Sequence, residues 1–108
     1  MSQESHHSSS WSNQSLIEQL GNIGSEVGRA RISYNHDESR FQGSVKRALE
    51  LFDRTLSDSR WIDQIEEIRM ARECFVDAIN GGEKYHTTLA DLDKYFTQFA
   101  ILAMRQYE

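Results

Sequence analysis

The stretch Leu16–Tyr34, LIEQLGNIGSEVGRARISY, determines how the rest of the chain can pack. Its apolar residues recur at steps of three and four, which places them on one face of an α-helix: Leu16, Leu20, Ile23, Val27, Ala30 and Tyr34. Beside this stripe lies a row of small residues that we call the glycine face: Gly21, Gly24, Ser25 and Gly28. Each glycine inside a helix costs about 1 kcal/mol relative to alanine. The sequence therefore predicts that another backbone packs closely against this face.

Three further segments carry apolar residues at helical spacing. The second helix is expected from Asp37 or Ser39 to about Ser57, and the fourth begins at Thr87 or Thr88. The third is expected from about Trp61 to Ile79, with Ile62 facing the core. Short connections make successive helices antiparallel neighbours. The sequence predicts an all-α, single-domain antiparallel four-helix bundle over residues 14–108, preceded by a disordered, polar tail over residues 1–13.

Local signals mark the helix ends. Ser12 or Asn13 is expected to cap the first helix, and Thr88 with Asp91 is expected to form a capping box at the start of the fourth. The run Asn80-Gly81-Gly82 is expected to end the third helix, because glycine readily adopts the left-handed backbone found just after a helix.

Composition excludes several classes of function. The 108 residues contain one cysteine, Cys74, so the chain forms no internal disulfide. With 12 Lys and Arg against 17 Asp and Glu, the net charge of −5 disfavours broad nucleic-acid binding. No apolar run approaches the ~18 residues of a membrane span, and a cytoplasmic protein without a membrane partner is expected.

Charged residues on the helices are the first candidates for chemistry. A di-metal carboxylate bundle requires Glu-x-x-His pairs, which this sequence lacks, so neither a metal nor another cofactor is expected. Glu26, Arg29 and Arg72 are instead expected to form a partly buried polar network near the glycine face.

Arg31 and His36 have the spacing Arg-x4-His, which resembles the motif of HEPN-class ribonucleases. That resemblance implies an arginine and a histidine that act together on an RNA phosphate and 2′-hydroxyl. In this sequence Ile32 follows the arginine, where the family usually has a polar residue, and the motif lies at the end of the first helix rather than on a late one. An RNA-binding domain or a metal-independent ribonuclease is the alternative function.

Longer runs carry a second resemblance: Ile23-Gly24-Ser25-Glu26-Val27-Gly28-Arg29-Ala30, Arg47-Ala48-Leu49-Glu50-Leu51-Phe52-Asp53 and Lys94-Tyr95-Phe96-Thr97-Gln98-Phe99. Together they resemble a family of uncharacterised small helical proteins of bacteria and archaea. The likeness spans nearly all of Leu16–Tyr107 and implies a compact helical domain of unassigned activity. More loosely, the chain is similar to HEPN-like helical partners of nucleotidyltransferases.

The favoured interpretation is a non-enzymatic helical protein-interaction module that engages a protein partner and associates with itself. Its first and fourth helices carry more apolar residues than one core face requires, and a symmetric dimer would cover the surplus. The alternative is that one helix is central and buried on several sides, which would also use the surplus. Tyr95 and Tyr107 are the predicted residues of the homodimer surface.

Overall fold

The computed structural model describes residue 11 and residues 13–105 of the chain. The predicted disorder of residues 1–10 and 12, and the predicted role of Tyr107, lie outside the described residues. The described elements are α2 (Leu16–Ser33), α3 (Glu38–Leu56), the short 3-10 helix η1 (Ser59–Gln64), α4 (Ile65–Ile79) and α5 (Leu89–Arg105). Throughout the described part of the chain there are helices and no strands, which confirms the predicted all-α four-helix fold.

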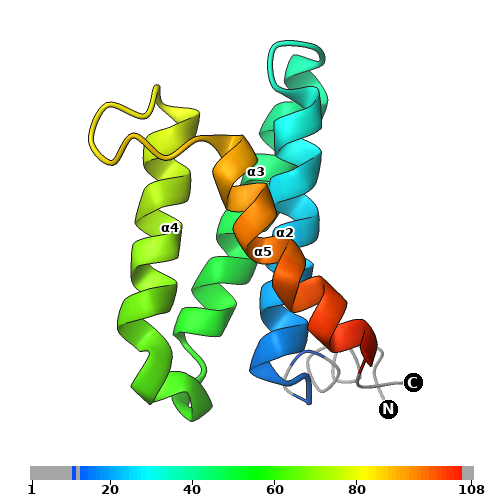
Figure 1. The fold of residues 1–108 in the computed structure, drawn as a ribbon, viewed down its shortest axis with the longest axis vertical. Helices are drawn as coiled ribbons and strands as arrows, with labels where there is room; N and C mark the ends of the chain where they lie inside the picture. Colours follow the sequence, from blue (N-terminus) through cyan, green and yellow to red (C-terminus); the bar gives the residue numbers. More distant parts are fainter. Residues whose placement is uncertain (1–10, 12, 106–108) are drawn as a thin grey trace, which may run out of the picture.

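Helix α2 is the centre of the domain. It packs extensively against both α3 and α5, whereas α4 makes sparser contacts with α3 and α5. In Figure 1, α5 (orange to red) crosses diagonally over α2 (blue to cyan), and α4 (yellow-green) stands to one side. The packing is therefore tight around α2 and looser where α4 meets α5.

The start of α2 differs from the prediction. Its N-cap is Ser15, whose hydroxyl accepts a hydrogen bond from the Glu18 amide at 3.2 Å, while the Glu18 carboxylate accepts one from the Ser15 amide at 2.9 Å. The prediction of Ser12 or Asn13 as the cap was wrong, because the reciprocal Ser-x-x-Glu pairing satisfies two amides at once.

Two other helix starts follow their predicted signals. Asp37 caps α3 by accepting a hydrogen bond from the Arg40 amide at 3.1 Å. Before α5, the Thr88 hydroxyl accepts from the Asp91 amide and the Asp91 carboxylate accepts from the Thr88 amide, so the capping box is confirmed.

The third predicted helix is divided in two. Residues Ser59–Gln64 form η1, where Trp61 has non-helical dihedral angles, and the α-helix begins only at Ile65. Ile62 is 64% exposed, so its predicted place in the core was wrong. The cause is the preceding turn, in which the Asp58 carboxylate accepts a hydrogen bond from the Arg60 amide and starts a tighter helix. The glycine stop is confirmed, since Gly81 and Gly82 have φ values of +109° and +71°.

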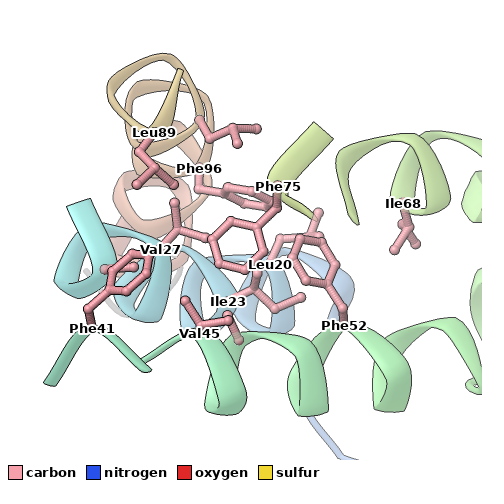
Figure 2. Close-up of a cluster of buried hydrophobic side chains, with 13 residues drawn as sticks. Leu20, Ile23, Val27, Phe41, Val45, Phe52, Ile68, Phe75, Leu89 and Phe96 are labelled. Carbon is pink, nitrogen blue, oxygen red and sulfur yellow. The ribbon is translucent and has the colours of Figure 1, made fainter. Parts of the chain in front are cut away.

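Aromatic rings form the middle of the core (Figure 2). The Phe52 ring lies 6.0 Å from that of Phe75 and 5.8 Å from that of Phe96, so one side chain joins α3 to both α4 and α5. Burying each phenylalanine contributes roughly 1.5–3 kcal/mol. The remaining buried apolar residues are Leu20, Ile23, Val27, Ala30, Phe41, Val45, Ala48, Ile68, Leu89 and Leu92.

Candidate functional site

Helix α5 covers the glycine face of α2. A Cβ atom built on Gly24 would lie 2.6 Å from the Phe96 Cβ atom, and one on Gly21 would lie 3.3 Å from the Ala100 Cα atom. A Cβ atom on Gly28 would lie 3.1 Å from the Asp93 carboxylate, while Ser25 is exposed and its hydroxyl donates to the Gly21 carbonyl at 3.3 Å. The three glycines of the glycine face thus pack against α5 within the chain, while Ser25 remains exposed.

Of the three residues of the predicted polar network, Glu26 and Arg29 pair with each other and Arg72 does not join them. Glu26 accepts hydrogen bonds from Arg29 at 2.9 Å and from Arg47 of α3 at 3.2 Å. Arg72 instead donates to Asp53 at 2.9 Å and so ties α4 to α3. The reason is the position of α4, which packs on α3 and α5 and places Arg72 beside Asp53. These pairs hold helices together at the surface, where each ion pair stabilises by roughly 0–1 kcal/mol.

Arg31 and His36, the alternative catalytic pair, have different surroundings. The Arg31 guanidinium donates to the Asp93 carboxylate of α5 at 2.6 Å, while His36 lies exposed in the turn between α2 and α3. Arg31 also lines a cavity of about 470 Å³. His86 lines the same cavity, and His36 does not. His86 has a φ of +59° in the loop before α5.

A buried glutamine joins parts of the chain that sequence reasoning did not connect. Gln19 is fully buried, and its amide donates to the Trp11 carbonyl at 3.2 Å and to Asp58 at 3.4 Å. Its oxygen accepts from the Trp61 indole at 3.1 Å. Gln19 therefore anchors residues before α2 to the turn between α3 and η1. The only signal in the sequence is a polar residue adjacent to the apolar stripe of α2.

The Asp58 carboxyl at this junction has a lower pKa than a free aspartate, so it stays ionised to lower pH. Hydrogen bonds from the Arg60 side chain lower the pKa of Asp58 to about 2, and the Arg60 amide and Gln19 contribute in the same direction. The Arg60 guanidinium also lies 4.4 Å over the centre of the Trp61 ring. The junction therefore holds the turn before η1 through several charged and polar contacts.

A mainly apolar hollow lies between α4 and α5, and we call it the α4–α5 groove. Its outer part, of about 390 Å³, is lined by Glu67, Met70, Ala71, Cys74, Thr87, Asp91, Leu92 and Tyr95. An inner part of about 190 Å³ shares Glu67, Ala71 and Tyr95 and extends to Leu16, Ile17, Leu20, Gln64, Ile68 and Phe99. Both parts are lined mainly by apolar side chains.

Tyr95 stands between the two parts of the groove. Its ring packs edge-on against the rings of Phe96 at 5.1 Å and Phe99 at 5.3 Å, and its hydroxyl donates to the Glu67 carboxylate at 2.6 Å. Burial, together with this hydrogen bond, raises the pKa of Tyr95 above its usual value. Tyr95 is thus half-buried and bridges α4 to α5, whereas the sequence placed it on an exposed contact surface.

The charges in the groove have one sign. Glu67 and Asp91 both line it, and no Lys, Arg or His of the described residues does. The hydrogen bond from the Thr88 amide lowers the pKa of Asp91, so this carboxylate stays ionised at neutral pH. The groove is an apolar surface with negative charge at its edge.

Apolar side chains are also exposed on the last turns of α5. Ile101 is 47% exposed, Leu102 is 41% exposed and Met104 is 70% exposed.

In the part of the chain that the structure describes, no helix is long and apolar enough to cross a membrane. The described residues also contain no group of His, Cys, Asp or Glu side chains that could hold a metal ion.

Comparisons of the chain with protein-family models, with curated proteins and with solved structures found no match.

Proposed function

We propose that this chain is a non-enzymatic helical protein-interaction module of the cytoplasm that forms a homodimer through the last turns of α5. The observation that carries the proposal is the exposure of Ile101, Leu102 and Met104 within four consecutive residues. Exposed apolar side chains that lie together on a surface usually mark an interface.

The distribution of apolar residues along α5 supports this surface. Leu89, Leu92 and Phe96 are buried in the domain, which uses one face of the helix. Ile101 and Leu102 lie on a different face, because each residue advances about 100° around a helix. A helix that packs on a single core needs an apolar face only about 100° wide, so the surplus is explained by contact with a second copy. Two-fold symmetric dimers are the commonest way to cover such a surface.

Light scattering of the full chain at micromolar concentration tests the proposal. We expect a mass near twice the 12.5 kDa of one chain. A single species at the mass of one chain would contradict self-association through α5.

A non-enzymatic role predicts that Arg31 and His36 do not cleave RNA. Arg31 already pairs with Asp93, and His36 does not line the cavity to which Arg31 contributes. We expect RNA incubated with the purified chain in the presence of a metal chelator to remain intact. Cleavage that disappears in a His36→Ala variant would favour the alternative function instead.

A further inference from the structure

The α4–α5 groove is lined by residues other than the exposed Ile101, Leu102 and Met104 at the end of α5. Its outer walls are α4 and α5, which contact each other sparsely and in Figure 1 diverge from the loop that joins them, and Leu16, Ile17 and Leu20 of α2 line its inner part. Ala71, Cys74 and Leu92 line its outer part, together with Met70, which is 47% exposed. Flexible methionine side chains adapt to the apolar residues of a bound partner.

From this surface we propose that the α4–α5 groove binds a cationic amphipathic α-helix of a partner protein. The inference deepens the interaction role proposed above by naming the chemistry of the partner. It does not depend on the homodimer, because the groove and the last turns of α5 are different surfaces.

The shape of the groove favours a helical partner. The inner and outer parts together run from Gln64, the last residue of η1, along α4 to Cys74, a length of about 15 Å at the helical rise of ~1.5 Å per residue. A third helix laid along two others places side chains at positions i, i+3, i+4 and i+7 into the apolar surface between them. Binding by strand addition would need a sheet edge, and the described residues form no strand.

The charge of the groove determines the sign of the partner. Glu67 and Asp91 stand at its edge, on α4 and α5 respectively, so lysine or arginine residues that flank the apolar stripe of a bound helix meet a carboxylate on either side. Complementary charges raise the association rate and exclude wrong partners, because like charges brought together are repelled. An acidic amphipathic helix would therefore be rejected even with the same apolar stripe.

Cys74 provides a direct measurement of occupancy. It is the only cysteine of the chain and it lines the outer part of the groove. The rate at which its thiol reacts with an aromatic disulfide reagent reports whether the groove is filled. The probes are two synthetic peptides of about 15 residues, roughly four helical turns. Both carry the same leucine stripe, and all remaining positions are lysine in one peptide and glutamate in the other.

We expect the lysine peptide to slow the reaction of Cys74 at least fivefold at saturation, and the glutamate peptide to leave the rate unchanged. The double variant Glu67→Gln/Asp91→Asn keeps the hydrogen-bond acceptors but removes both charges. It should bind the lysine peptide roughly tenfold more weakly, because two ion pairs at the rim of an interface together contribute about a factor of ten in affinity. The matched control Glu38→Gln/Glu50→Gln makes the same change in net charge on exposed residues of α3 and should bind as the unmodified chain does.

Three results would overturn the proposal. Equal protection by both peptides would show that charge does not select the occupant. Binding of the lysine peptide without protection of Cys74 would place the site elsewhere. A thiol rate that falls as the protein alone is concentrated would make a second copy of the chain the occupant. Light scattering reports the α5 homodimer independently, so failure of either proposal can be distinguished from failure of the other.

Discussion

Gly24 lies so close to Phe96 that a Cβ atom at position 24 would be 2.6 Å from the Cβ atom of Phe96. The Phe96 Cβ position is fixed by the backbone of α5, so the contact can be relieved only by moving the two helices apart. We expect Gly24→Ala to destabilise the fold by about 1–3 kcal/mol through overpacking, which exceeds the gain of about 1 kcal/mol in helix propensity.

Gly43→Ala is the matched control for this substitution. It lies inside α3, and its nearest neighbour is the guanidinium of Arg47 at 3.4 Å, the movable end of a long side chain. We expect this variant to be more stable by up to about 1 kcal/mol. Thermal unfolding of the two variants should shift Tm in opposite directions, and equal shifts would show that α5 does not require a glycine at position 24.

Gln19→Leu tests the buried junction between α2 and η1. The variant keeps the volume of the side chain but leaves the Trp61 indole and the Trp11 carbonyl without their partner. Unpaired polar groups cost about 1–3 kcal/mol, so Tm should fall by several degrees, and the tryptophan fluorescence should change. Gln42→Leu, on the exposed side of α3, should change Tm little, and a similar loss in both variants would contradict the role of Gln19.

Asp58→Asn tests the pH dependence of the same junction. Because the pKa of Asp58 is about 2 in the folded chain against 3.8 for the free side chain, its ionised form contributes stability above pH 3.8 that is lost as the pH falls toward 2. The variant should be less stable than the unmodified chain at pH 7, and the difference should narrow between pH 4 and pH 2. A difference that stays constant over this range would show that the charge of Asp58 is not involved. Asp63→Asn in η1 controls for removal of a nearby exposed carboxylate.

Leu102→Glu tests the proposed homodimer surface. Leu102 is 41% exposed, so a glutamate there should leave the helical content unchanged and shift the mass in light scattering from two chains to one. Gln98→Glu adds the same charge to an exposed position one turn earlier and should leave the dimer in place. Dissociation by both substitutions would indicate a general charge effect rather than an apolar contact.

The same experiment with Tyr95 would not be interpretable. Tyr95 packs against Phe96 and Phe99 and donates to Glu67, so Tyr95→Glu would disturb the fold as well as any interface. Its position on α5 could be predicted from helical periodicity, but its burial could not, because that depends on how α4 and α5 diverge.

Local signals in the sequence predicted the helices well. The apolar stripe of α2, the Thr88–Asp91 capping box and the Gly81-Gly82 stop all act within a few residues, and their outcomes follow from backbone geometry. Two failures were also local, at the N-cap Ser15 and at the Asp58–Arg60 turn that divides the third helix. The other failures arise over longer distances. Gln19 is buried by Trp11 and by Trp61, which is 42 residues away, and Arg72 pairs with Asp53 of another helix. No periodicity within one helix encodes such contacts.

The glycine face of α2 also determines the order in which the domain can be completed during synthesis on the ribosome. Helices α2 and α3 are adjacent in the chain and can pair early, but the surface of Gly21, Gly24 and Gly28 is covered only by α5, the last described helix to be made. Contacts between segments so far apart in sequence form slowly. Until α5 emerges, the nascent chain exposes the side of Phe52 that Phe96 will cover. Exposed apolar surface of this kind favours aggregation, so this unfinished intermediate is the form of the protein that most requires protection by chaperones.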